Sequence, residues 1–188
     1  LRHGVEHNAT PFDLYYPTPV AGNLQATIAY EQNRWCVTRQ LHFSGTRTAD
    51  SIDMVLSLNG LPIITMELKN ELSCQDVEHA VSQYKTDRDP KELLFMPKRC
   101  AVHFAVDDAD VKMCTALNGK SSWFLPFNKG VNDGAGNPVN PNGLKTAYLW
   151  EEVLQKPRLS EILENYAQVI RERDQETGKI KEKNIWPR

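Results

Sequence analysis

Residues 51–70 read SIDMVLSLNGLPIITMELKN and form two apolar, extended segments joined at Asn59-Gly60. An Asn-Gly pair between alternating or β-branched runs is a strong short-range signal for a β-hairpin. Asp53 lies on the first arm of this hairpin, and Glu67 and Lys69 lie on the second. The hairpin therefore decides which polar side chains can meet on one face of a sheet.

The register of the hairpin determines whether the two acids can meet. A two-residue turn over Asn59-Gly60 would place Ile52 opposite Glu67 and turn Asp53 to the other face. A three-residue connection that includes Leu61, or a one-residue bulge, makes one face wholly apolar. In that register the expected pairs are Ile52 with Leu68, Met54 with Met66, Leu56 with Ile64, Asp53 with Glu67 and Ser51 with Lys69. Because hydrophobic pattern and acid geometry agree on it, we predict a three-residue turn or a bulge.

These three polar residues suit the hydrolysis of a phosphodiester. Mg²⁺ binds oxygen ligands with one or two carboxylates and leaves positions for water and phosphate oxygens. We expect Asp53 and Glu67 to bind Mg²⁺, with Mn²⁺ as a possible substitute. Lys69 would project from the Glu67 face roughly 7 Å further along the strand and could orient or deprotonate the attacking water. A solvated strand face can also carry an acid and a lysine by chance.

Residues 51–70 closely resemble the nuclease core of the restriction subunit of type I restriction enzymes, a family of the PD-(D/E)xK nucleases. The resemblance continues through residues 83–90 (QYKTDRDP), 102–107 (VHFAVD), 124–128 (FLPFN) and 146–151 (TAYLWE). It implies an α/β fold of the restriction-endonuclease-like kind, with a central mixed β-sheet flanked by α-helices. It also implies a type I site-specific deoxyribonuclease that cuts double-stranded DNA endonucleolytically and depends on Mg²⁺.

The same resemblance sets expectations about domains and partners. Residues 1–188 would be one nuclease domain from a longer polypeptide whose ATP-driven translocase is absent, with recognition and methylation left to specificity and modification (methyltransferase) subunits. Residues 118–121 (NGKS) end like a nucleotide-binding loop, but Cys114 stands where that loop needs glycine, so we expect no ATP site. Two alternatives stay open: a dormant nuclease-fold module that needs the translocase, and a repair exonuclease, for which no end-binding feature is found.

Composition is that of one globular domain, with 188 residues and 40% hydrophobic residues. No segment has the length of a membrane span and no secretion signal opens the chain, so we expect a cytoplasmic protein. The four cysteines are widely spaced and predict reduced thiols. The net charge of −2 argues against DNA binding by bulk electrostatics, and local contacts are expected instead.

A helix is predicted after the hairpin, capped by Ser73 with Asp76 in a capping box, apolar along one side, and ended before Pro90. Related nucleases often carry a Gln-xxx-Tyr signature on this helix. Tyr84 matches the tyrosine, but Ala80 stands at the glutamine position. Gln83 is adjacent to Tyr84 and would point about 100° away from it. We regard Gln83, Tyr84, Lys85 and Arg88 as supporting or DNA-binding residues, and Tyr84 could instead be an apolar anchor.

The rest of the chain is predicted in outline. We expect a helix over residues 24–32, strands over 35–43, 99–106 and 111–117, and a surface excursion over 128–143. An amphipathic helix over residues 160–173 and a lysine-rich tail would follow. His103, inside an apolar strand, is expected to be a packed residue.

Overall fold

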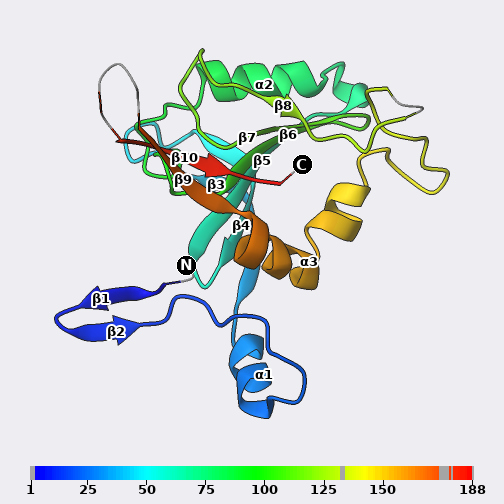
Figure 1. Cartoon of the computed structure of the whole chain (residues 1–188). Coiled ribbons are helices and arrows are strands. Elements are labelled where there is room, and N and C mark those ends of the chain that lie inside the picture. The colour runs from blue at the N-terminus through cyan, green and yellow to red at the C-terminus, as the bar shows by residue number, and fades with distance from the viewer. Residues whose placement is uncertain (1–2, 132–133, 174–177, 179, 188) are drawn as a thin grey trace.

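The computed structural model describes residues 3–131, 134–173, 178 and 180–187, and its centre is a six-stranded mixed sheet (Figure 1). The strand order is β3-β4-β5-β6-β7-β8, in which β5 and β6 run parallel and the other neighbours antiparallel. The strands are β3 (Trp35–His42), β4 (Ser51–Leu58), β5 (Leu61–Leu68), β6 (Val102–Val106), β7 (Val111–Cys114) and β8 (Leu125–Pro126). Helices lie against the sheet, which confirms the predicted α/β fold.

The hairpin of β4 and β5 contains the predicted one-residue bulge. Its turn is the two-residue Asn59-Gly60 turn, with φ of 51° and 82°, and Leu58 pairs with Leu61 across it. The register then shifts between Leu56 and Ser57, so that Ile63 is the extra residue on β5. Beyond the bulge, Leu56 pairs with Ile64 and Met54 with Met66, as predicted. The three-residue turn is therefore wrong, and the bulge alone sets the register.

One face of the sheet is covered by α2 (Val77–Thr86), which follows the short helix η1 (Glu71–Ser73). The helix packs against β5, β6 and β7 with its predicted apolar side buried. Val77, Ala80, Val81 and Tyr84 belong to a cluster with Val55, Ala105 and Cys114. The cap is Asp76, which forms a capping box with His79, whereas Ser73 lies in η1. The predicted Ser73 cap was wrong because Cys74, at φ 54°, ends η1 and separates it from α2.

The opposite face is covered by η2 (Leu149–Val153), α3 (Lys156–Glu161) and η3 (Ile162–Tyr166), followed by the antiparallel pair β9 (Gln168–Arg173) and β10 (Ile180–Ile185). The main core joins them to the sheet through Leu149, Leu159, Ile162, Ile64 and Phe104. The predicted helix over 160–173 is therefore wrong beyond Tyr166. Residues 168–173 are extended because β10, in the segment predicted as a tail, supplies a pairing strand.

That terminal segment is also part of the core. Trp186 is buried and its ring meets Phe104 edge-on at 6.2 Å between centroids. Burying a tryptophan ring contributes roughly 1.5–3 kcal/mol, the range for a large apolar side chain. The C-terminal strands thus stabilise the sheet from the face opposite α2.

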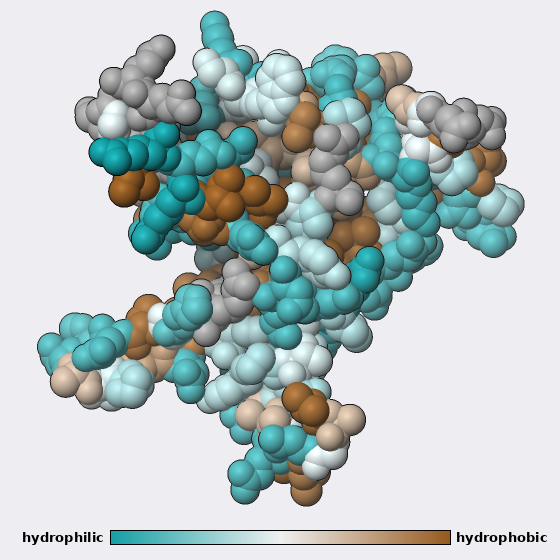
Figure 2. All heavy atoms as spheres, in the orientation of Figure 1, coloured by the Kyte–Doolittle hydropathy of each residue, from teal (hydrophilic) through white to brown (hydrophobic). Residues whose placement is uncertain are grey.

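The N-terminal part projects from this body in both views (Figures 1 and 2). It contains β1 (Val5–His7), β2 (Thr10–Phe12) and α1 (Leu24–Glu31), and neither strand nor α1 has a buried residue. The predicted helix over 24–32 is confirmed, as are the three predicted strands, although β3 and β7 end earlier, at His42 and Cys114, and β6 begins later, at Val102. None of the described helices is long and apolar enough to cross a membrane.

The predicted excursion over residues 128–143 is partly anchored. Asn128 accepts a hydrogen bond from the Val111 backbone, and the buried Asn137 donates to the Ala109 carbonyl. Val131 and Gly134 form an isolated bridge, and residues 132–133 lie outside the described part. These amides satisfy backbone groups at the β6–β7 turn, which is why a polar loop can lie against the sheet.

Candidate active site

Two carboxylates, Asp53 of β4 and Glu67 of β5, lie together at the end of the paired part of the hairpin. The β4–β5 ladder stops at Met54 and Met66, and the backbone N–H of Leu68 donates to Asp53 Oδ2 at 2.8 Å. The strands separate at the acids, where the Asp53 side chain accepts the Leu68 N–H in place of a backbone carbonyl. The predicted Ile52–Leu68 pair is absent from the described ladder, and Ile52 packs in the α2-side cluster instead. The wholly apolar face therefore ends at Met54.

A third strand also contacts the site. Gln40 of β3 donates from Nε2 to Asp53 Oδ1 at 3.0 Å and accepts from Ser51 Oγ at 2.8 Å. Each oxygen of Asp53 thus receives one hydrogen bond from an uncharged donor. Gln40 was not among the predicted site residues, because nothing in the hydrophobic pattern distinguishes it from other exposed positions on an edge strand.

Arg88 lies beyond the end of α2 and reaches back to the acids. Its Nε donates to Glu67 Oε1 at 2.6 Å, and its Nη2 donates to the Ser51 carbonyl at 2.9 Å. The guanidinium also lies over the Phe43 ring, 5.5 Å from the centroid. Only 6% of Arg88 is exposed. These contacts occupy the residue inside the protein and leave little of it available to a DNA backbone.

Glu67 is fully buried, and its charge is costly there. Burial raises its pKa to about 8; hydrogen bonding and the charge of Arg88 oppose this shift, whereas the charge of Asp53 adds to it. Its second oxygen, Oε2, is buried and has no hydrogen-bond partner among the described residues. A buried acceptor without a partner is expensive unless something else binds it.

The acid pair fits a divalent cation such as Mg²⁺. Glu67 Oε2 is free to bind one, and Asp53 supplies a second carboxylate beside it. In the described part of the chain no group of three or more His, Cys, Asp and Glu residues could hold a metal. Two carboxylates nevertheless suffice for Mg²⁺, which retains several waters and takes phosphate oxygens as further ligands.

A third carboxylate, Asp107, stands at the end of the neighbouring strand β6 but serves the backbone. Its Oδ2 accepts from Val77 N, and its Oδ1 accepts from Ala109 N and Asp110 N, each at 2.7 Å. These bonds fix the start of α2 and the turn after β6. Asp107 is therefore a structural carboxylate, committed to N–H groups.

Lys69 follows β5 directly and is half-buried. Its backbone N–H donates to the Val106 carbonyl at 2.8 Å, which extends the parallel pairing of β5 and β6 by one residue. Strand alternation puts its side chain on the Glu67 side. Its ammonium group makes no hydrogen bond or ion pair with the residues that the structure describes. Lys69 is thus available to a ligand at the acid pair.

Tyr84 and His103 form a buried polar chain with Thr65. The Tyr84 hydroxyl and His103 Nδ1 lie 2.8 Å and 2.7 Å from Thr65 Oγ1. Burial raises the pKa of Tyr84 well above its usual value and lowers that of His103 to about 3. His103 is a packed residue, as predicted. Tyr84, fully buried, fixes α2 to β5 two residues before Glu67.

Gln83 and Lys85 are placed differently from Arg88. The Gln83 side-chain oxygen is buried and has no hydrogen-bond partner among the described residues. Lys85 lies toward β7: burial raises the pKa of the Cys114 thiol, and the charge of Lys85 opposes that shift. The structure therefore separates Lys85, on α2, from Arg88, which lies beyond the end of the helix.

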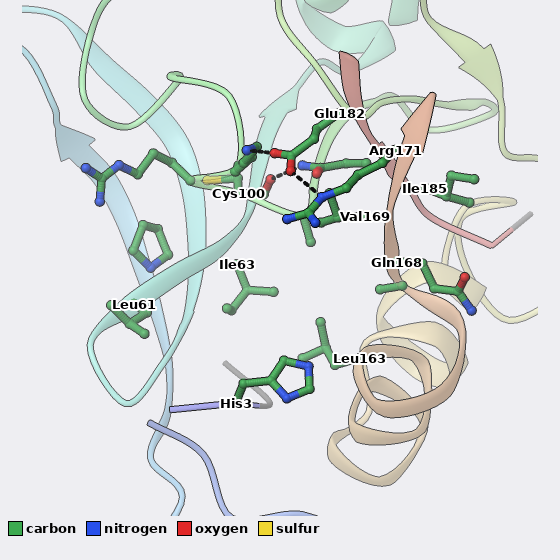
Figure 3. Close-up of a pocket in the computed structure, with 16 residues that line it drawn as sticks. His3, Leu61, Ile63, Cys100, Leu163, Gln168, Val169, Arg171, Glu182 and Ile185 are labelled. Atoms are coloured by element: carbon green, nitrogen blue, oxygen red, sulfur yellow. Dashed lines mark hydrogen bonds and ion pairs between the residues drawn. The ribbon is translucent and has the colours of Figure 1, made fainter. Parts of the chain in front are cut away.

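A pocket of about 610 Å³ opens at the other end of β5 (Figure 3). Leu61 and Ile63 line one side of it, and Val169 and Arg171 of β9 line the other. Glu182 pairs with Lys98 and with Arg171, its neighbour across the β9–β10 pair, so these three charged lining groups are satisfied by one another. The pocket is separate from the acid pair, which stands where β5 ends.

A mixed sheet with a parallel central pair, carboxylates on adjacent strands and a helix packed over them defines a restriction-endonuclease-like core. Comparison with protein families gives a match to the type I restriction enzyme R protein N terminus over residues 23–122, more than half of the chain. The chain belongs to this family and is a restriction-enzyme nuclease domain. Neither the curated proteins nor the solved structures contain a significant match.

Proposed function

We propose that this chain cleaves double-stranded DNA endonucleolytically, with Mg²⁺, as the nuclease domain of a type I restriction subunit. The observation that carries the proposal is Glu67 Oε2, a buried and unpartnered oxygen beside a second, oriented carboxylate. Such a pair, on adjacent strands of this fold, is a binding site for a hard cation. The family match supports the same assignment.

Each residue has a distinct task in this proposal. Asp53 and Glu67 hold the cation, which when bound polarises the scissile phosphate and acidifies a water molecule. Hydrogen bonds from Gln40 and Leu68 hold the Asp53 carboxylate in one orientation. Lys69, whose ammonium is unengaged, orients the attacking water or, once deprotonated, accepts its proton. Attack on phosphorus then breaks one P–O bond, and the negative charge passes to the leaving oxygen.

Binding of DNA by this domain is proposed to be local and without strong sequence preference. The net charge of −2 gives little bulk attraction for a polyanion. Specificity and modification subunits, acting through the full-length restriction subunit, would select the site and bring the DNA. Cleavage would take place in the cytoplasm, where the DNA substrate is found.

Plasmid cleavage tests the proposal. The chain is incubated with supercoiled plasmid and Mg²⁺ or Mn²⁺, beside Lys69→Ala and an EDTA control. Nicked or linear product that is lost in both controls is the expected result. An exonuclease would leave closed circles intact. Cleavage that persists in EDTA would contradict the proposal.

A dormant domain is the second candidate, and the Arg88–Glu67 pair favours it. Glu67 is fully buried, and Arg88 of the same chain already occupies one of its two oxygens. Such a domain would bind metal but cut only when the translocase presents DNA. The full-length restriction subunit, assayed with its partner subunits with and without ATP, separates the candidates. Dormancy is indicated if the isolated chain binds Mn²⁺ without cutting DNA and cleavage occurs only in the ATP-driven complex.

A further inference from the structure

Gln40 has an unusual backbone for its place in the sheet. Its φ is 49°, in the left-handed region that non-glycine residues rarely occupy. The β3–β4 ladder pairs Arg39 with Met54 and Leu41 with Ile52 but omits Gln40 and Asp53 between them. The other described non-glycine residues with positive φ lie in turns, loops or helix ends: Asn8, Ala9, Asn59, Cys74 and Lys98.

The side chain of Gln40 uses this irregularity to bridge two residues of β4. Its amide nitrogen donates to Asp53 Oδ1 at 3.0 Å, and its amide oxygen accepts from Ser51 Oγ at 2.8 Å. The Ser51 hydrogen bond fixes which end of the amide faces Asp53, because only the nitrogen can donate to a carboxylate. Gln40 therefore presents a donor to Asp53 in one defined orientation.

We propose that Gln40 is a positioning residue, whose strained backbone is kept so that its amide holds the Asp53 carboxylate in the orientation that binds the divalent cation. The inference rests on the proposed function. Strained residues persist where the surrounding structure enforces them, and they concentrate at functional sites. A backbone irregularity that only protected the edge strand β3 from pairing with another chain would not need a side-chain amide between Ser51 and Asp53.

The chemistry favours an amide here over a charged donor. A lysine or arginine at this position would compete with the cation for Asp53. A neutral donor uses one lone pair of Oδ1, leaves the carboxylate its charge, and removes its rotational freedom. Leu68 N does the same at Oδ2. Gln40 thus lowers the ordering cost of metal binding without reducing the charge at the site.

Gln40→Gly separates the backbone from the side chain, because glycine accepts positive φ without strain but removes the amide. We expect its melting temperature to equal or exceed that of the unmodified chain. Its dissociation constant for Mn²⁺, measured by calorimetry, should rise about 10-fold or more, as for other residues that orient metal ligands. Ser51→Ala, which removes only the far anchor of the amide, should raise it by a smaller factor.

Ala9→Gly is the matched control, since Ala9 also has positive φ (59°) but lies in the exposed turn between β1 and β2. It should leave Mn²⁺ affinity unchanged. If Gln40→Gly binds Mn²⁺ as tightly as the unmodified chain, Gln40 has no positioning role. The proposed function itself fails, and this inference with it, if the unmodified chain does not bind Mn²⁺ or if Asp53→Asn binds it equally well.

Discussion

Arg88 and Glu67 form a fully desolvated ion pair, with 2.6 Å between Nε and Oε1 and exposed fractions of 6% and 0%. The arginine comes from beyond α2, and the glutamate from the centre of the sheet. Each charged group is stabilised by the other, because either one buried alone would carry a large desolvation penalty. The pair also leaves Glu67 Oε2 unengaged, so the same glutamate can face an arginine and a metal at once.

Removal of the arginine alone should destabilise the fold. At a pH above 8, where Glu67 is charged, Arg88→Met leaves its carboxylate buried without a cation, and we expect the free energy of unfolding to fall by about 3 kcal/mol. The double variant Arg88→Met with Glu67→Gln should recover most of this loss, because no charge then remains buried. Urea denaturation of both variants measures the coupling.

Arg158→Met serves as the control for that cycle. Arg158 pairs with Glu161 at 2.8 Å, but both side chains are largely exposed. Its loss should change stability by less than about 1 kcal/mol. Equal effects of Arg88→Met and Arg158→Met would mean that burial adds nothing to the Arg88–Glu67 pair.

Stability should depend on pH through Glu67. Its pKa is about 8 in the folded chain, above the ordinary value of 4.5, so between these values the folded state holds a proton that the unfolded state has released. The contribution of Glu67 is therefore fully present below pH 4.5 and is lost as pH rises toward 8. Chemical denaturation from pH 4.5 to 8 should show this decline in the unmodified chain relative to Glu67→Gln. Parallel pH profiles would show that Glu67 has an ordinary pKa in the folded state.

Substitution of the two acids should separate metal binding from folding. Asp53→Asn keeps an oxygen for Leu68 N–H, so stability should change by less than about 1 kcal/mol while Mn²⁺ binding and cleavage are lost. Glu67→Ala should also abolish both, but it leaves Arg88 buried and unpaired and should lower stability by several times as much. Calorimetric Mn²⁺ titration and thermal melting of the two variants test this contrast. Retained Mn²⁺ affinity in Asp53→Asn would exclude Asp53 as a ligand.

Lys69→Ala should affect turnover alone. The ammonium group has no partner among the described residues, so the melting temperature and the Mn²⁺ dissociation constant should stay unchanged. Single-turnover cleavage should slow by about 10²- to 10⁴-fold, the usual contribution of a general acid or base. Lys156→Ala, which changes an exposed lysine at the start of α3, is the control and should cut normally. If Lys69→Ala cuts at the normal rate, the Lys69 amine does not activate the attacking water.

Tyr84→Phe should reduce stability but not DNA affinity. The substitution removes the hydroxyl that contacts Thr65 Oγ1 and leaves the ring and the Thr65–His103 contact in place. We expect a loss of about 1 kcal/mol, the usual net value of a hydrogen bond. Because Tyr84 has no exposed surface, KM for plasmid cleavage should stay constant. A higher KM with unchanged stability would place Tyr84 at the DNA.

Much of the site follows from local pattern. Residues close together in the chain determine three of its features. These are the hairpin at Asn59-Gly60, the register shift that brings Asp53 and Glu67 together, and the apolar side of α2. Periodicity and turn preference describe such features well, because the interactions that cause them are local. The mixed sheet came instead from the family resemblance, which did not specify that β5 and β6 are its parallel pair.

What the sequence did not reveal depends on partners distant in the chain. Gln40 is significant only because Asp53 and Ser51 lie beside it on the neighbouring strand β4, and Arg88 only because the chain turns back after α2. Residues 168–173 have an apolar spacing that suits a helix, but β10 offers them a strand to pair with. Cross-strand pairing of this kind outweighs local propensity, which is a weak constraint by comparison.

The bulge at Ile63 contains the one residue by which the arm between the turn and Glu67 exceeds a regular hairpin. Deleting Ile63 would join Pro62 to Ile64 and leave the pairs of Ser57 with Pro62, Leu56 with Ile64 and Met54 with Met66 in one continuous register, so Glu67 would keep its face. Inserting one residue between Ile64 and Glu67 would instead turn Glu67 toward the main core unless a second bulge formed. This arm should therefore tolerate the loss of one residue at the bulge and lose its activity on gaining one.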